Sequence, residues 1–161
     1  MITVEEYNIL KQYTGIYKVK ERYDLKNLIM YFTQVIGTDC DLNWMDVSNI
    51  TDMSDIFWCS EFNGDISKWD VSNVTKMSCM FDSSDFNGDI SDWNISNVTD
   101  MSYMFFGSKF NRDISKWIIK IKDCNTEDMF KGCPIKDEYK PKKWIIKDCP
   151  IKDEYKHKKI R

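Results

Sequence analysis

Apolar residues in the middle of the chain recur at positions that repeat every 24 residues. Three copies begin at Asp46, Asp70 and Asn94 and read DVSNITDMSDIFWCSEFNGDISKW, DVSNVTKMSCMFDSSDFNGDISDW and NISNVTDMSYMFFGSKFNRDISKW. The same apolar type occupies the same place in each copy, as in Val47/Val71/Ile95, Met53/Met77/Met101, Phe57/Phe81/Phe105, Phe62/Phe86/Phe110 and Ile66/Ile90/Ile114. A unit this short cannot bury its own apolar side, so we expect the copies to stack with each column forming a continuous core.

Within one copy, the spacing of the apolar residues changes from a strand pattern to a helix pattern. In the segment 66–74 isoleucine, tryptophan and valine face one side of an extended chain, whereas in the segment 74–81 apolar residues follow at intervals of three and four. We therefore predict an α/β fold. Its architecture would be a leucine-rich-repeat-like solenoid of short strand plus short helix units, with a helical N-terminal cap.

The repeats divide the chain into four parts. Residues 1–41 predict an N-terminal cap of two helices and an edge strand, and residues 42–116 hold the three repeats. Residues 117–143 hold a degenerate fourth repeat and a C-terminal cap. Residues 144–161 duplicate pieces of the preceding part, which predicts a loosely packed tail.

Two sequence signals support helices in the cap. Thr3 and Glu6 have the spacing of a capping box, in which each residue satisfies the backbone N–H of the other. Asp24 is the expected N-cap of a second helix, and Gly37 is expected just after its end.

Composition and charge exclude several classes of protein. Hydrophobic residues make up 42% and charged residues 30%, which is typical neither of a disordered chain nor of a membrane protein. No apolar run reaches the roughly 18 residues of a transmembrane helix. The net charge of −3 gives no drive toward nucleic acid or anionic lipid. The start of the chain lacks the pattern of a signal peptide, which favours a cytoplasmic location over the cell surface and reduced thiols for the six cysteines.

The unit W-D-V-S-N-V-T-x-M-S-x-M-F-x-x-S-x-F-N-G-D-I-S resembles a known repeat. It is similar to the tandem repeat of about 25 residues in BspA-type leucine-rich-repeat surface proteins. The same unit occurs in a bacterial lipoprotein repeat family of unknown function. The likeness covers about residues 40–140. It implies a leucine-rich-repeat-like superhelix and a role in binding or adhesion, and it supplies no catalytic residue.

The residue types needed for catalysis or metal binding are sparse. The single histidine, His157, lies in the predicted tail, where nothing would hold it against a nucleophile. The column Asp65/Asp89/Asp113, beside Asn63/Asn87/Asn111, could line a cation site, but calcium requires six or more oxygen ligands. We favour the interpretation that each Asp or Asn accepts a backbone N–H in its own turn. We expect no catalytic residue, no bound metal and no cofactor.

The tryptophans Trp69, Trp93 and Trp117 occupy one column and allow two interpretations. A row of exposed indoles would stack sugars or bases, but such surfaces also carry basic neighbours. The neighbours here are mixed in charge, so we favour burial of the indoles in the core.

These observations favour a non-enzymatic repeat scaffold that mediates protein–protein interaction. Its binding surface would be the strand face, where side chains between the core positions point outward: Ser67, Lys68, Asp70, Ser91, Asp92, Asn94, Ser115 and Lys116. The partner is expected to be a protein and not a nucleic acid. The alternative is an adhesin-like surface protein of the BspA type, and a metal-dependent or hydrolytic enzyme is a remote one.

Overall fold

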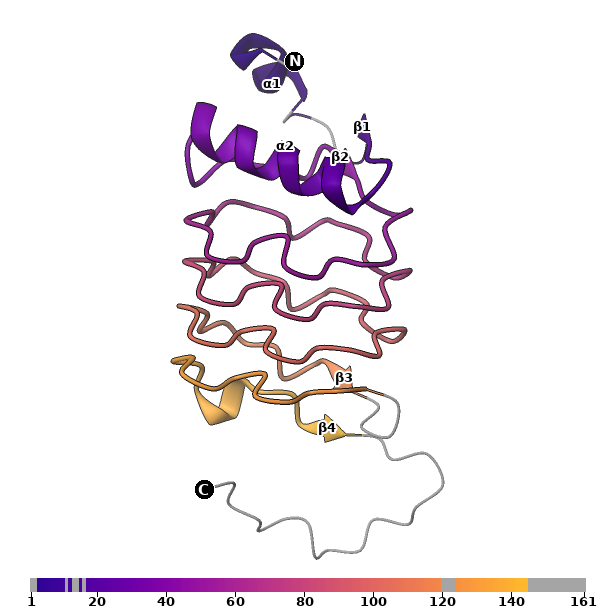
Figure 1. Ribbon diagram of the computed structural model, residues 1–161, viewed down its shortest axis with the longest axis vertical. Helices are drawn as coiled ribbons and strands as arrows, with labels where there is room; N and C mark the ends of the chain where they lie inside the picture. Colours follow the sequence, from indigo (N-terminus) through magenta and orange to yellow (C-terminus); the bar gives the residue numbers. More distant parts are fainter. Residues whose placement is uncertain (1–2, 11, 13–14, 16, 120–123, 145–161) are drawn as a thin grey trace, which may run out of the picture.

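The computed structural model describes residues 3–144 except 11, 13–14, 16 and 120–123. Two helices lie at the N-terminal end of an elongated molecule, and the repeats follow below them in sequence order (Figure 1). The elements are α1 (Val4–Leu10), β1 (Tyr17–Lys18), α2 (Arg22–Val35), β2 (Met45–Asp46), β3 (Ile118–Ile119), the 3₁₀ helix η1 (Asp137–Tyr139) and β4 (Lys143–Trp144). β1 pairs with β2 and β3 pairs with β4, both in parallel. Most of the predicted tail, with His157, lies outside the described residues.

The prediction of an α/β, leucine-rich-repeat-like solenoid is wrong. Between β2 and β3, residues 47–117 contain no helix and no strand, only turns and isolated bridges. The α-helices are confined to the N-terminal end, and each strand is two residues long. The repeats are therefore irregular, turn-rich coils, and the predicted unit of strand plus helix does not occur in them.

The segment 74–81, predicted to be helical, is a series of turns whose N–H groups point in two directions. The N–H of Asp82 donates to the Cys79 carbonyl at 3.2 Å within its own repeat, whereas the N–H of Phe81 donates to the Met104 carbonyl of the next repeat at 2.8 Å. Cys79 also has a φ of 53°, in the left-handed region that interrupts a right-handed helix. Because alternate N–H groups are committed to the next repeat, the bonds between residues i and i−4 cannot form.

The segment 66–74, predicted to be a strand, is bent by two turns. The N–H of Trp69 donates to the Ile66 carbonyl at 3.2 Å, and the N–H of Val74 donates to the Val71 carbonyl at 2.9 Å. Each bond closes a turn that no extended strand allows. The apolar side chains still face one way, because the turns bring them to the same side.

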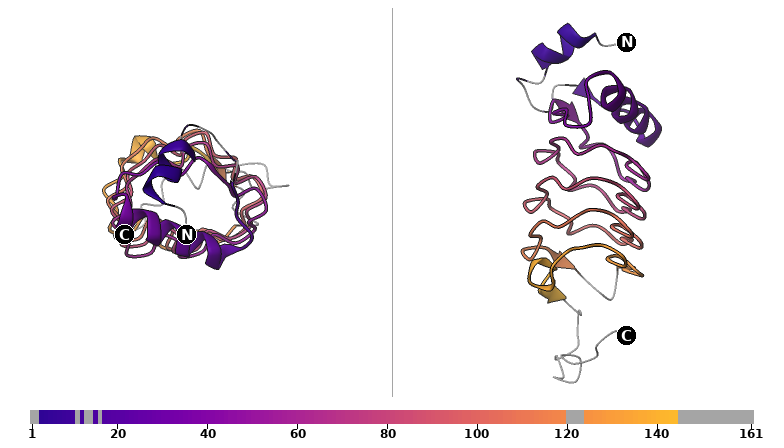
Figure 2. Two further views of the ribbon diagram at one scale, coloured as in Figure 1. Left: turned by 90° about the horizontal axis from the view of Figure 1, so that it is seen from above. Right: turned by 90° about the vertical axis from the view of Figure 1, so that its left-hand side faces the viewer.

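The apolar columns form the core, as the repeat predicted. Every residue of the five columns is buried. The rings of Phe57, Phe81, Phe105 and Phe130 stack with centroids 5.1, 5.5 and 5.7 Å apart. Seen from above, the coils nearly superimpose (Figure 2). Phe130 thus continues the phenylalanine column into the coil that follows the third repeat.

The N-terminal helices begin and end largely where the sequence signals place them. The Thr3 N–H donates to the Glu6 carboxylate at 2.7 Å, and the Glu6 N–H donates to Thr3 Oγ1 at 3.2 Å, so the capping box is present. The second helix starts two residues before Asp24, with Glu21 as its N-cap. Gly37 follows its end with a φ of 125°. Helix α2 lies across the top of the repeats (Figures 1 and 2).

Candidate binding surface

The eight side chains predicted to form a strand face lie on turns, not on a strand. We call the surface that they form the turn face. Five of them are exposed and the three serines are half-buried: Lys68, Asp70, Asp92, Asn94 and Lys116, and Ser67, Ser91 and Ser115. The outward direction was therefore predicted well, whereas the backbone conformation was not.

Aspartate–serine pairs build the same turn in each repeat. The N–H groups of Ser67, Ser91 and Ser115 donate to Oδ1 of the aspartate two residues earlier, at 2.9, 2.9 and 2.8 Å. This confirms that the column Asp65/Asp89/Asp113 binds backbone N–H groups in its own turns. Hydrogen bonds from Ser91 lower the pKa of Asp89, so this carboxylate is ionised at neutral pH.

Two of the eight residues on the turn face also hold the backbone. Oδ1 of Asp70 accepts the Ser72 N–H at 3.0 Å, and Oδ1 of Asn94 accepts the Ser96 N–H at 3.2 Å. The hydrogen bonds from Ser72 lower the pKa of Asp70. A carboxylate and an amide thus perform the same structural task, which leaves the charge at this position free to vary.

The asparagine column joins neighbouring repeats. Asn63 Oδ1 accepts the Asn87 N–H at 2.7 Å, and Asn87 Oδ1 accepts the Asn111 N–H at 2.9 Å. Asn111 Oδ1 accepts the Lys136 N–H at 3.3 Å. The prediction that each asparagine bonds within its own turn is therefore wrong, because the acceptor and the donor belong to successive repeats.

Side chains of opposite charge occupy one column of the turn face. Lys68, Asp92 and Lys116 take equivalent places in successive repeats and are exposed. Lys116 Nζ lies 3.3 Å from Asp92 Oδ1, with 75% and 84% of the two side chains exposed. Ion pairs this exposed contribute at most about 1 kcal/mol to stability. These charges are therefore available to a partner at little structural cost.

A hollow of about 410 Å³ opens where the turn face meets the last coil. Ser91 and Lys116 line it together with five residues that were not predicted as binding residues: Asp89, Asn111, Arg112, Asp113 and Tyr139. Two cationic and two anionic side chains thus face the same space. This arrangement suits a ligand that carries charges or hydrogen-bonding groups of both kinds.

Arg112 stands where the other repeats have glycine. A Cβ at Gly64 would lie 1.9 Å from the Cys40 carbonyl oxygen, and a Cβ at Gly88 would lie 3.2 Å from the Gly64 carbonyl oxygen. Arg112 Nε donates to the Asn87 carbonyl at 2.7 Å. The change from N-G-D to N-R-D was visible in the sequence and could have indicated this residue. Tyr139 carried no such signal, because it comes from the following coil.

The tryptophan column belongs to the core, as favoured from the sequence. Trp69, Trp93 and Trp117 are 4%, 5% and 2% exposed. Each indole N–H donates to the carbonyl 27 residues earlier, in the preceding coil, at 2.9, 3.3 and 3.2 Å. These indoles therefore link repeats and offer no stacking surface to a ligand.

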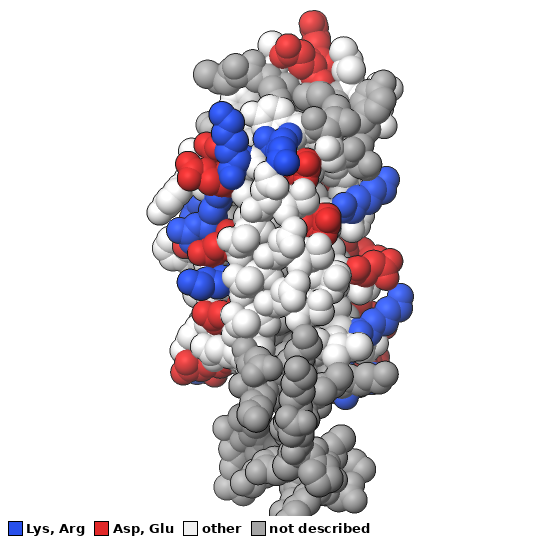
Figure 3. Space-filling view, turned by 90° about the vertical axis from the view of Figure 1, so that its right-hand side faces the viewer, with Lys and Arg blue, Asp and Glu red and all other residues white. Residues whose placement is uncertain are grey.

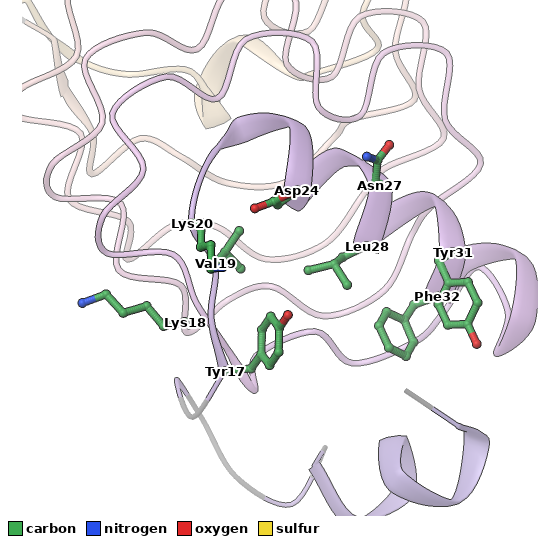
Figure 4. A pocket seen from close by; sticks show the side chains of 9 residues that line it. All are labelled: Tyr17, Lys18, Val19, Lys20, Asp24, Asn27, Leu28, Tyr31 and Phe32. Carbon is green, nitrogen blue, oxygen red and sulfur yellow. The ribbon is translucent and has the colours of Figure 1, made fainter. Parts of the chain in front are cut away.

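A second hollow of about 490 Å³ lies between β1 and α2 (Figure 4). Figure 4 shows the Tyr17 ring beside it, with Leu28 projecting inward from α2 and Lys18 directed away. Its nine lining residues are Tyr17, Lys18, Val19, Lys20, Asp24, Asn27, Leu28, Tyr31 and Phe32. Apolar and tyrosine side chains make up much of this lining, in contrast to the charged hollow near Arg112.

One side of the molecule carries an uncharged band along its long axis, bordered by charged residues on both margins (Figure 3). This is the side on which β1, β3 and β4 lie in Figure 1. In the repeats, exposed Asn and Thr side chains donate hydrogen bonds from one coil to the next. Thr75 Oγ1, for example, donates to the Thr51 carbonyl at 3.0 Å, and Asn73 Nδ2 donates to the Ser48 carbonyl at 2.9 Å. Such residues are occupied in holding the coils together.

Five cysteines lie in the described part and are free thiols: Cys40, Cys59, Cys79, Cys124 and Cys133. Burial raises the pKa of Cys40 to about 12 and that of Cys124 to about 11, so these two thiols are weak nucleophiles at neutral pH. Among the described residues, no three His, Cys, Asp or Glu side chains gather in a way that could hold a metal ion. Nor does this part of the chain contain a helix long and apolar enough to span a membrane.

The comparisons with known proteins identify a family but not an activity. The family described as "Mycoplasma protein of unknown function, DUF285" matches residues 26–144, from within α2 to the end of β4. No curated protein and no solved structure matches the chain. Since the match covers most of the chain and all three repeats, the protein belongs to this family of unknown function.

Proposed function

We propose that the protein is a non-enzymatic scaffold that binds a protein partner through the turn face, centred on the hollow beside Arg112. One observation carries the proposal. Equivalent turns with the same aspartate–serine hydrogen bond present different charges outward, in the column Lys68, Asp92 and Lys116. A constant backbone with variable outward side chains is the arrangement by which repeat proteins recognise partners.

The chemistry of the hollow suggests the kind of partner. Arg112 and Lys116 would donate hydrogen bonds to carboxylates of the partner, and Asp89 and Asp113 would accept them from its lysine or arginine side chains. Because these groups are near the surface, they would govern the association rate and the specificity more than the affinity. We therefore expect binding that weakens as salt is raised above physiological concentration, where the screening length falls below about 8 Å.

Quantitative capture from a native lysate, comparing four immobilised proteins, tests the proposal. Arg112→Gly installs the residue that the other repeats carry at this place, and Lys116→Glu reverses a charge in the hollow. Lys109→Ser is the matched control, because this exposed lysine does not line the hollow. The proposal predicts a partner that the wild type and Lys109→Ser retain and that Arg112→Gly and Lys116→Glu lose. Equal recovery by all four proteins would overturn it.

An adhesin-like surface protein of the BspA type is the alternative. Its support is the likeness of the repeat unit to the BspA-type repeat, and it requires that the protein reach the outside of the cell. Protease added to intact cells would then cleave it, whereas a cytoplasmic control protein would survive. A metal-dependent or hydrolytic activity has weaker support, since neither histidine nor cysteine lines the hollow.

A further inference from the structure

The contacts between coils have a direction. In the first repeat the N–H groups of Met53, Asp55, Phe57 and Cys59 donate to carbonyls of the second repeat, at 2.8–3.0 Å. The equivalent four N–H groups of the second and third repeats do the same toward the coil that follows, at 2.7–2.9 Å. Along these segments, each coil therefore presents carbonyls on its N-terminal edge and N–H groups on its C-terminal edge.

Helix α2 covers the carbonyl edge of the first repeat. Arg22 Nη1 donates to the Ser54 carbonyl at 3.2 Å, and Lys26 Nζ lies 3.0 Å from Asp55 Oδ1. Cationic side chains thus meet an edge of hydrogen-bond acceptors. Further addition of a chain at this end would require the displacement of α2.

The opposite edge, on the fourth coil, has backbone N–H groups at the same places as the three earlier coils. The register of the preceding contacts makes four N–H groups equivalent to the donors of the third repeat: those of Thr126, Asp128, Phe130 and Gly132. We call these four groups the donor edge. Asp128 and Gly132 have φ values of 47° and 73°, close to the 57° and 59° of Tyr103 and Gly107 in the third repeat. The backbone therefore has the shape that binds a polypeptide in the three earlier coils.

No acceptor for these four N–H groups is found among residues 3–144 as far as they are described. N–H groups aligned on one side of the backbone form an electropositive edge that attracts oxygen acceptors. The donor edge lies beside the end of the phenylalanine column, where Phe130 is half-buried and Lys140 Nζ lies over its ring, 5.7 Å from the centroid. A segment docked here would satisfy the four donors and extend the stack of coils.

We propose that the donor edge binds a backbone segment of another protein, which lies parallel to residues 126–132 and offers the carbonyls of alternate residues. The three contacts between successive coils are the precedent, since each joins the same donors to a polypeptide. A second copy of this chain fits poorly, because α2 covers its carbonyl edge. The segment would carry apolar side chains spaced as in the repeats, so that one packs on Phe130 in place of the Lys140 side chain. This site is distinct from the turn face, and the proposal does not depend on the proposed function.

Amide exchange and chemical shifts, measured by NMR on the full chain, test the proposal. The probe is a synthetic peptide with the sequence of residues 73–85, which contains the carbonyls that the first repeat binds. In the free protein we expect the four amides of the donor edge to exchange rapidly and those of Met101, Tyr103, Phe105 and Gly107 to be protected. Added peptide should shift the four signals and slow their exchange at least about tenfold, whereas a scrambled peptide should not.

A backbone variant distinguishes binding through hydrogen bonds from nonspecific binding of the peptide. Thr126→Pro removes one donor, and Thr126→Ser keeps it. We expect Thr126→Pro to weaken peptide binding about threefold to tenfold, since one hydrogen bond is lost, and Thr126→Ser to leave it unchanged. Protection of the four amides in the free protein would overturn the proposal, because the edge would then be occupied within the chain. Shifts confined to other residues, or equal binding by both variants, would overturn it as well.

Discussion

The inner and outer sides of the repeats share one backbone but differ in how much their side chains vary from repeat to repeat. Inside, equivalent positions keep one apolar type, and their rings stack from coil to coil at 5.1–5.7 Å. Outside, equivalent positions change from lysine to aspartate and back, as in Lys68, Asp92 and Lys116. This difference indicates that the stability of the stack resides in the buried columns and in the hydrogen bonds between coils. The turn face can therefore vary without loss of the fold.

The largest expected effect concerns the inner side. Trp93→Ala removes a buried indole and its hydrogen bond to the Ile66 carbonyl, so the free energy of unfolding should fall by about 3–5 kcal/mol. Trp58, which is 55% exposed, is the matched control, and Trp58→Ala should cost no more than about 0.5 kcal/mol. Urea denaturation measures both. Similar losses in the two variants would contradict the division into inner and outer sides.

The close approach of coils at the glycine column predicts a smaller effect. Gly64→Ala places a Cβ 1.9 Å from the Cys40 carbonyl oxygen, so the backbone must move, at a cost of about 2–3 kcal/mol. At Gly88 the nearest backbone atom is 3.2 Å from the new Cβ, and the other contacts are with the Phe86 ring. Gly88→Ala should therefore cost less. Thermal melts of the two variants should rank them in this order, and the reverse order would show that the coils are spaced differently.

The aspartate turns predict how stability depends on pH. Hydrogen bonds from Ser72 and Ser91 lower the pKa of Asp70 and Asp89 in the folded protein. A lowered folded pKa adds stability that is fully present above the unfolded value of about 3.9 and is lost as the pH falls through the folded value. Stability should therefore change little from these groups between pH 7 and 5 and decline below about pH 4.

Asp70→Asn tests this origin of the acid sensitivity. Asn94 shows that an amide accepts the same turn hydrogen bond, so the variant should fold, and at pH 7 it should lose only the small contribution that the charge of this exposed carboxylate makes to stability. Its decline in acid should be shallower than that of the wild type, as measured by urea denaturation from pH 2.5 to 7. An identical acid profile would mean that Asp70 does not contribute through its charge.

The sequence predicted the buried columns and the outward side chains but not the local backbone. Spacings of three and four between Met77, Met80 and Phe81 fit a helix, yet the same side chains reach the core from a series of turns. Cys79 and Tyr103 adopt left-handed φ values of 53° and 57°. Such values are uncommon for residues other than glycine, so the residue types at these positions do not predict them. Hydrogen bonds between coils determine this backbone conformation, and they depend on residues about 24 positions away.

The candidate site was predicted in part for a related reason. Lys68, Asp92 and Lys116 are exposed because each lies between a buried isoleucine and a buried tryptophan, and that pattern is readable from one repeat. The hollow arises only where Arg112 replaces a glycine and where Tyr139 arrives from the next coil. A site assembled from adjacent coils requires the register between them, which one repeat alone does not reveal.

The central claim is that the turn face recognises a partner while the inner columns hold the fold. Its most direct test compares the double variant Arg112→Gly with Lys116→Glu against the wild type in both stability and binding of the captured partner. We expect the free energy of unfolding to change by no more than about 0.5 kcal/mol and the affinity to fall at least about tenfold. Unchanged affinity in a folded double variant would contradict the claim.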